Sequence, residues 1–123
     1  MNRRILVIDD DPDIIRLCKI LMEKRGDLVE VAGNGKEALP KLIENPPEIV
    51  LLDLMMPELD GFEVVEALSS AGVTRPRIIV ITAKALTPQE KSYLDKHVEL
   101  IIKKGADDLI EVLERVMRDL DPK

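Results

Sequence analysis

The sequence predicts an α/β domain in which a mainly parallel β-sheet is covered by helices on both faces. Short apolar runs recur along the chain, and four of them are continuous rather than alternating, which is typical of strands buried on both faces. Each run is followed by a turn signal and a stretch with helical spacing. Five such units in succession favour a parallel sheet with right-handed crossovers. The length of 123 residues suits one domain, so we expect a single domain over residues 1–123.

Five segments are expected to form the strands. The four continuous apolar runs are residues 5–8, 49–52, 78–81 and 100–102. Residues 29–32, with the sequence Val-Glu-Val-Ala, alternate between apolar and polar side chains. This alternation predicts a shorter and more exposed strand.

The sequence also marks where the helices should begin. The predicted N-caps are Asp11, which precedes Pro12, and then Asn34, Asp60 and Thr87. Thr87 is followed three residues later by Glu90, which is the spacing of a capping box. The helix that Thr87 opens should run to about Lys96.

Three further features bear on the helix lengths. Gly26 should close the first helix, directly after two basic residues. Pro40 falls inside the second helix and should kink or shorten it, because proline removes a hydrogen bond. The last helix should span roughly Asp107 to Leu120, and its apolar face is expected to contain Leu109, Ile110, Leu113, Val116, Met117 and Leu120.

Composition excludes several classes of protein. The formal net charge of -6 argues against direct nucleic-acid binding, which needs a surplus of lysine and arginine. Cys18 is the only cysteine, so an intrachain disulfide is impossible, and we expect a small buried apolar residue there. No apolar run approaches transmembrane length or forms a signal-peptide core. We therefore expect a cytoplasmic protein without membrane contact.

Polar side chains follow the expected strands at the points where those strands end. They are Asp9, Asp10 and Asp11 after the first run, Asp53 after the third, Thr82 after the fourth, and Lys103 and Lys104 after the fifth. Ligands of open α/β sheets bind beyond the carboxyl ends of the strands, so we expect these groups to converge at one edge. Asp11, directly before a proline, is expected to act only as a helix cap.

The chemistry of these groups points to magnesium and phosphate. Several carboxylates placed together repel one another and raise one another's pKa unless a cation intervenes. Magnesium prefers oxygen ligands and fills its remaining positions with water and substrate phosphate. A lysine ammonium and a threonine hydroxyl supply the charge neutralisation and hydrogen bonds that phosphoryl transfer requires. A carboxylate is an adequate nucleophile at phosphorus.

Four motifs, in order and over essentially the whole chain, resemble the receiver domain of bacterial response regulators. They are residues 5–11 (Ile-Leu-Val-Ile-Asp-Asp-Asp), residues 51–57 (Leu-Leu-Asp-Leu-Met-Met-Pro) with Asp60-Gly61 behind them, Ile81-Thr82-Ala83, and a lysine after the final strand. The resemblance implies a flavodoxin-like, CheY-like three-layer sandwich. Its five-stranded parallel sheet has the strand order 2-1-3-4-5 and carries five helices.

The resemblance also implies roles for the polar residues. Asp53 would be the phosphoacceptor, Thr82 would close on the phosphoryl group, and Lys104 would pair with it. The implied magnesium ligands are Asp10, Asp53 and the backbone carbonyl of Met55, with Asp9 acting through water. Lys104 is preferred to Lys103 because its separation from Thr82 is similar to the family's, and because successive strand side chains point to opposite faces.

A signalling cycle follows from the resemblance. A sensor histidine kinase or a histidine phosphotransfer protein would donate the phosphoryl group in a reaction that depends on Mg2+. The chain would be no enzyme in the usual sense, since it would catalyse only its own phosphorylation and dephosphorylation. The new charge would draw Thr82 and Lys104 inward. A downstream protein would then read the face formed by the fourth helix, the fifth strand and the fifth helix.

The sequence departs from the family pattern at three places. Gly105 stands where proline usually follows the lysine, which affects the path of that loop. Ile101 replaces the aromatic residue three positions before the lysine, so the coupling of threonine to an aromatic switch cannot operate in full. Met55 and Lys84 occupy positions that, in the family it resembles, flank the approach of hydrolytic water, and we expect them to modulate the lifetime of the phosphoryl group.

Three other interpretations deserve comparison. Residues 33–38 fit the dinucleotide motif Gly-x-Gly-x-x-Ala, with Asp53 as the ribose-binding acid, but Pro40 interrupts the helix. A phosphatase resembling the haloacid-dehalogenase superfamily would need Asp-x-Asp-x-Thr, and residues 9–13 lack the threonine. A receiver-like interaction module that is never phosphorylated would leave the acidic, hydroxyl and amine groups without use.

His97 is expected to be a solvated residue at a helix C-terminus.

Overall fold

The sheet has five parallel strands whose order follows from the pairing of their apolar runs. In the computed structural model, which describes residues 3–105 and 108–121, this order is β2-β1-β3-β4-β5. The strands are β1 (Arg4–Ile8), β2 (Leu28–Ala32), β3 (Ile49–Leu52), β4 (Arg77–Thr82) and β5 (Leu100–Lys103). The helices are α1 (Pro12–Lys24), α2 (Gly35–Glu44), α3 (Gly61–Ser70), α4 (Pro88–Asp95) and α5 (Leu109–Asp119). The predicted three-layer fold and strand order are confirmed.

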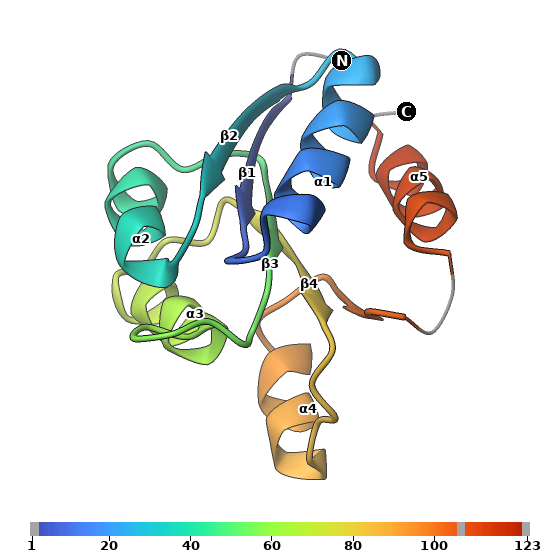
Figure 1. Ribbon diagram of the computed structural model, residues 1–123. Coiled ribbons are helices and arrows are strands. Elements are labelled where there is room, and N and C mark those ends of the chain that lie inside the picture. The colour runs from blue at the N-terminus through green and yellow to red at the C-terminus, as the bar shows by residue number, and fades with distance from the viewer. Residues whose placement is uncertain (1–2, 106–107, 122–123) are drawn as a thin grey trace.

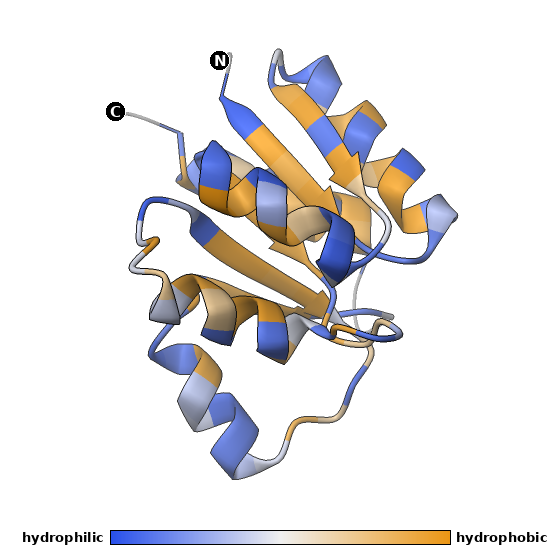
Figure 2. Cartoon of the chain, turned by 90° about the vertical axis from the view of Figure 1, so that its left-hand side faces the viewer, coloured by the Kyte–Doolittle hydropathy of each residue, from blue (hydrophilic) through white to orange (hydrophobic). Residues whose placement is uncertain are grey.

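Continuous apolar strands fill the middle layer of the sandwich because each face of the sheet receives its own helices. Alternate strand residues pack with α1 and α5 on one face, around Cys18, Met22, Leu113 and Met117. The intervening strand residues pack with α2, α3 and α4 on the other face. Figure 1 shows the helices on either side of the sheet, and Figure 2 shows the apolar strands between them.

The two edge strands, β2 and β5, differ from the prediction in length and in burial. β2 is the more exposed strand, as expected, but its five residues make it as long as β1. The run at residues 100–102 was expected to be buried on both faces, which is wrong in part. β5 is the other edge strand, and Leu100 is 40% exposed. A run of apolar residues does not reveal whether a strand has one neighbour or two.

The predicted helix caps are confirmed. The side chains of Asp11, Asn34, Asp60 and Thr87 each accept a hydrogen bond from a backbone N–H in the first turn of their helix. Gly26, at φ 91°, follows the C-cap Arg25 and closes α1 as predicted. The N–H of Asp27 donates to Met22 O and that of Gly26 to Glu23 O, which together form a Schellman motif.

Helices α2 and α5 differ in part from what the sequence predicted. α2 continues past Pro40 to Glu44, so the proline does not end it. α5 begins at Leu109 after the N-cap Asp108, and the predicted start at Asp107 lies outside the described residues. The predicted apolar face of α5 is wrong at Ile110, which is 41% exposed, whereas Val112 packs on the core.

In the described part of the chain, no helix has the length and apolar character needed to cross a membrane.

Candidate functional site

Two neighbouring strands bring the acidic residues together. Asp9 follows β1 and Asp53 follows β3, and the register pairs Ile8 with Leu52, so the two aspartates leave the sheet side by side. The N–H of Asp53 donates to Ile8 O at 2.9 Å, which continues the sheet into the site. Oxygen atoms of Asp9, Asp10 and Asp53 all lie within 4.8 Å of one another. Asp9 and Asp53 are buried, at 2% and 4% exposure, and Asp10 is exposed.

Backbone N–H groups orient the two buried carboxylates. The N–H of Asp11 donates to Asp9 Oδ1 at 2.9 Å, and the N–H of Met55 donates to Asp53 Oδ1 at 3.3 Å. Each carboxylate therefore keeps its other oxygen, Oδ2, for a partner across the site. Asp11 also caps α1, as the sequence predicted.

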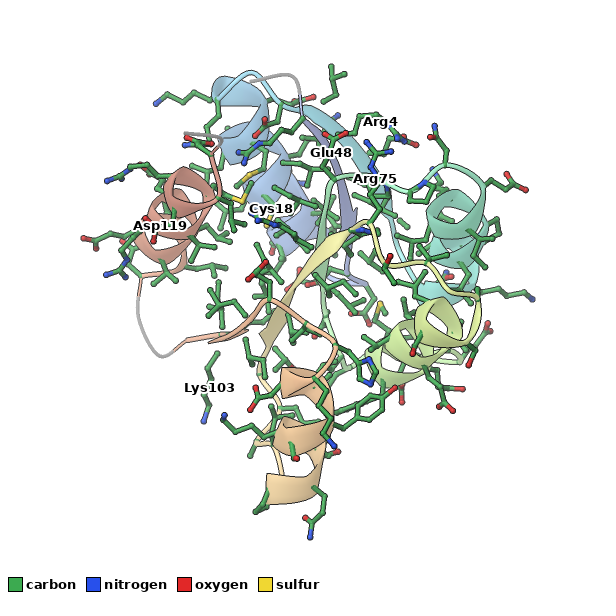
Figure 3. The ribbon with its side chains drawn as sticks, turned by 180° about the vertical axis from the view of Figure 1, so that it is seen from behind. Arg4, Cys18, Glu48, Arg75, Lys103 and Asp119 are labelled. Atoms are coloured by element: carbon green, nitrogen blue, oxygen red, sulfur yellow. The ribbon has the colours of Figure 1, made fainter. Side chains whose placement is uncertain are left out.

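A lysine from the far end of the chain is that partner. The Nζ atom of Lys104 lies 3.0 Å from Asp9 Oδ2 and 3.5 Å from Asp53 Oδ2. The backbone N–H of Lys104 donates to Thr82 O at 2.8 Å, which fixes the turn after β5 against the end of β4. Lys103 is exposed and extends away from the sheet in Figure 3. The structure therefore places Lys104, and not Lys103, on the acidic pair.

The negative charges of Asp9 and Asp53 are only partly neutralised by the ammonium of Lys104. Burial raises the pKa of Asp53, and the charge of Asp9 raises it further, while the N–H of Met55 and the ammonium of Lys104 act in the opposite direction. Burial by itself would lower the pKa of Lys104, but hydrogen bonding and attraction by Asp9 and Asp53 outweigh it and raise that pKa. A hard divalent cation with oxygen ligands fits this arrangement, because it would relieve the repulsion between the carboxylates.

Thr82 ends the neighbouring strand on the same edge. The β3–β4 register pairs Leu52 with Val80, two residues before Thr82, so the threonine lies one strand away from Asp53. Thr82 is 1% exposed, and its Oγ1 accepts a hydrogen bond from the N–H of Lys84 at 3.1 Å. The predicted groups from four separate segments thus meet at one edge.

Residues from the loops after β3 and β4 and from the first turns of α3 and α4 line a cavity. The cavity has a volume of about 440 Å³, and its lining includes Met55, Phe62, Lys84 and Glu90. Met55 is 56% exposed. The ammonium of Lys84 lies 3.1 Å from Glu90 Oε1. The sequence predicted Glu90 as a capping residue but gave no signal for this ion pair, because the two residues are six positions apart across a loop.

The remaining candidate residues have structural explanations. A Cβ atom on Gly35 would lie 2.6 Å from Leu59 O and 2.9 Å from Val64 Cγ2, so close packing against the start of α3 accounts for this glycine of the motif without a dinucleotide. Cys18 is fully buried, as expected, and burial raises the pKa of its thiol to about 12. His97 is exposed after the end of α4, and its ring centroid lies 4.7 Å from that of Tyr93.

Fold and site together define a class of protein: a doubly wound α/β domain with a lysine-bridged acidic site at the carboxyl edge of its sheet. The family model of the response regulator receiver domain matches residues 5–116. The chain belongs to this family and is a receiver domain of the kind found in two-component response regulators.

Curated relatives and solved structures agree with this assignment. The chain is 37% identical over 111 residues to the DNA-binding response regulator MtrA of Mycolicibacterium smegmatis, covering 89% of this chain and 44% of MtrA. It is 40% identical over 84 residues to the alkaline phosphatase synthesis transcriptional regulatory protein PhoP of Bacillus subtilis, covering 68% of this chain and 35% of PhoP. The chain thus spans less than half the length of these relatives.

Solved structures of receiver domains share the fold, some of them at about 30% sequence identity. The N-terminal domain of a response regulator receiver protein from Methanoculleus marisnigri JR1 matches with a TM-score of 0.76 and 31% identity, covering 100% of both chains. The response regulator TrrA of Thermotoga maritima, solved in complex with Mg(2+)-BeF, matches with a TM-score of 0.78 and 30% identity. This match covers 96% of this chain and 99% of TrrA.

Proposed function

We propose that Asp53 accepts a phosphoryl group and that the chain works as a phosphorylation switch. The observation that carries the proposal is the ammonium of Lys104, which lies between the buried carboxylates of Asp9 and Asp53. Burial and the charge of Asp9 raise the pKa of Asp53, so an ionised Asp53 costs the fold free energy. A role in chemistry accounts for keeping that costly carboxylate.

In the proposed reaction a carboxylate oxygen of Asp53 forms a bond to phosphorus while the bond from phosphorus to the leaving group breaks. The leaving group is acetate from acetyl phosphate or the imidazole of a phosphohistidine, and it departs with the electron pair of the broken bond. The ammonium of Lys104 offsets the negative charge of the phosphoryl oxygens. The hydroxyl of Thr82, which accepts a hydrogen bond from the N–H of Lys84, donates its own hydrogen to one of them.

The same proposal assigns a metal site. Asp9, Asp10, Asp53 and the backbone carbonyl of Met55 would hold Mg2+, with Asp9 acting through water. The clustering of three carboxylate oxygens within 4.8 Å supports this assignment, as does the Mg(2+)-BeF complex of TrrA. When bound, the ion neutralises part of the charge on the carboxylates and on the phosphoryl oxygens.

We further propose that the donor is a sensor histidine kinase or a histidine phosphotransfer protein, and that a downstream protein reads the phosphorylated form. Receiver domains are not classical enzymes, and we propose that this chain catalyses only its own phosphorylation and dephosphorylation. The net charge of -6 supports a domain that does not itself contact DNA. MtrA is named a DNA-binding response regulator, but this chain covers only 44% of it. A cytoplasmic location and a single domain over residues 1–123 stay predictions.

Intact mass after incubation with acetyl phosphate tests the proposal. Wild type should gain one phosphoryl group in the presence of magnesium and none in its absence, and Asp53→Asn should gain none. Lys104→Ala should slow the gain about 100-fold, because it removes a cation from the phosphoryl site. Lys103→Ala is the matched control and should leave the rate unchanged, since that side chain is exposed. A wild-type chain that takes up no phosphoryl group would instead favour the unphosphorylated interaction module.

Met55 and Lys84 supply a second test of the same site. Both side chains line the same cavity, and Met55 is 56% exposed. We expect the double substitution Met55→Asn, Lys84→Glu to change the dephosphorylation rate by about threefold or more, because it replaces a bulky apolar group and a cation along the path of water. The rate is measured as loss of phosphoryl mass after removal of the donor. An unchanged rate would refute a role of these two residues in phosphoryl lifetime.

A further inference from the structure

Lys84 connects the hydroxyl of Thr82 to helix α4. Its backbone N–H donates to Thr82 Oγ1 at 3.1 Å, and its ammonium lies 3.1 Å from Glu90 Oε1 in the first turn of α4. The side chains of Lys84 and Glu90 are 33% and 28% exposed, so the ion pair is partly shielded from solvent. Lys84 therefore contacts both the hydroxyl of Thr82 and the first turn of α4.

Glu90 serves two partners with the same oxygen. Its Oε1 accepts the backbone N–H of Thr87 at 2.9 Å, while its own N–H donates to Thr87 Oγ1 at 3.1 Å, which completes the capping box of α4. The hydrogen bond from the Thr87 backbone and the interaction with Lys84 hold the pKa of Glu90 below its usual value. The carboxylate is therefore an ionised, fixed partner for the lysine at neutral pH.

A second capping box shows that the lysine is not needed for the cap. Asp60 and Glu63 make the same reciprocal hydrogen bonds at the start of α3, at 2.9 and 3.1 Å. In the described part of the chain Glu63 has no lysine or arginine partner. The ion pair of Glu90 with Lys84 thus adds something beyond helix capping.

Lys84 and Glu90 line the 440 Å³ cavity together with Met55 and Met56, which belong to the loop that follows Asp53. Among the described residues, the only ammonium paired with Asp53 is that of Lys104. Lys84 has a flexible four-carbon stem, so its ammonium can exchange partners without movement of the backbone. A phosphoryl group carries more negative charge than the carboxylate of Glu90 and competes with it for a nearby cation.

We propose that Glu90 is a positioning residue that holds the ammonium of Lys84 on α4 until a phosphoryl group on Asp53 draws it away. This inference rests on the proposed function of Asp53. Transfer of Lys84 to the phosphoryl group breaks the ion pair that joins the loop after β4 to Glu90 in α4. The start of α4 is thereby released by the charge on Asp53.

The test is a double-mutant cycle on the rate of phosphorylation by acetyl phosphate in the presence of magnesium, followed by intact mass. Glu90→Gln keeps an acceptor for the capping box but removes the charge, so it should release Lys84 and raise the rate about threefold at low salt. The gain should shrink as salt rises. In a Lys84→Gln background the same Glu90→Gln substitution should have no effect. Glu63→Gln is the matched control and should leave the rate unchanged.

The outcomes separate this inference from the proposed function. An unchanged rate in Glu90→Gln, or an equal gain in the Lys84→Gln background, would overturn the inference while Asp53 still gains its phosphoryl group. A wild-type chain that gains none at Asp53 would overturn both. In the unphosphorylated protein, the amide resonance of Lys84 should move in Glu90→Gln and not in Glu63→Gln, and a resonance that stays in place would also contradict the ion-pair role.

Discussion

At the scale of single residues, Asp53 is a carboxylate whose burial opposes its ionisation. The side chain is 4% exposed and lies beside Asp9, which is 2% exposed, so two carboxylates share one poorly solvated site. A single ammonium, that of Lys104, serves both. One cation between two buried anions leaves a residual repulsion, which folding must overcome whenever no further cation is bound.

Replacing Asp53 by asparagine should therefore stabilise the metal-free protein at pH 7 by about 1 kcal/mol. Burial and Asp9 raise the pKa of Asp53 above its usual 3.8 in the folded state. The folded protein then holds this proton more tightly than the unfolded chain, so wild type loses stability as the pH rises through the raised pKa. Urea unfolding in EDTA should show the advantage of Asp53→Asn at pH 7 and its disappearance below pH about 3.8.

The exposed neighbour Asp10 provides the control for this prediction. Asp10→Asn removes the same charge from a solvated position, so its effect on the free energy of unfolding should be much smaller than that of Asp53→Asn. Equal effects of the two substitutions, or a destabilised Asp53→Asn protein in EDTA, would contradict the account of a strained buried carboxylate.

At the scale of secondary-structure elements, Gly61 lets α3 begin directly against the end of β3. A Cβ atom at this position would lie 2.5 Å from Asp53 O and 2.7 Å from Leu54 Cα, and both of these are backbone atoms. The N–H of Gly61 donates to Leu54 O at 3.1 Å, which ties the helix start to the loop that follows Asp53. The loop geometry around Asp53 thus depends on a residue eight positions away.

Gly61→Ala should destabilise the protein by about 3 kcal/mol, because neither backbone group can move aside without disturbing the strand end. Thermal and urea unfolding measure the loss, and the phosphorylation rate of the remaining folded protein should fall with it. Gly33→Ala is the matched control: the nearest atom to its Cβ is Glu37 Oε2 at 3.9 Å, an ordinary contact. Comparable losses in the two variants would show that close approach at Gly61 is not the cause.

Caps and strand ends were predictable from the sequence because they depend on residues a few positions apart. Asp60 and Thr87 mark the starts of their helices because they cap them by local hydrogen bonds. The polar residues after the apolar runs predict the site because parallel strands end at the same edge of the sheet. The exposure of Leu100 and Ile110 was not predictable, since it depends on which elements lie beside β5 and α5. The ion pair between Lys84 and Glu90 depends on the path of a loop, which no local pattern specifies.

At the scale of the whole molecule, charged residues gather at the pole opposite the acidic site. Arg4, Glu48 and Arg75 lie together there in Figure 3, and Arg75 Nη2 lies 2.9 Å from Glu48 Oε1. Deeper in the same pole is an ion network that joins the start of β1, the turn before β2 and the end of α5. Its members are Arg3, Arg25, Asp27 and Asp121.

Asp27 is the buried centre of this network, and its substitution should have the largest effect of any exchange at this pole. Its side chain is fully buried, and its oxygens lie 3.4 Å from Arg3 Nε and 3.9 Å from Arg25 Nε. Asp27→Ala should cost about 3 kcal/mol in urea unfolding, because it leaves buried positive charge without its central counter-ion. Glu30→Ala, which removes a 54% exposed partner of Arg4, should cost under about 1 kcal/mol.

Since Asp27 and Asp53 lie at opposite ends of the sheet, the folded Asp27→Ala protein should take up a phosphoryl group at the wild-type rate. Similar losses of stability for Asp27→Ala and Glu30→Ala would show that the network does not fasten the two ends of the chain to the sheet.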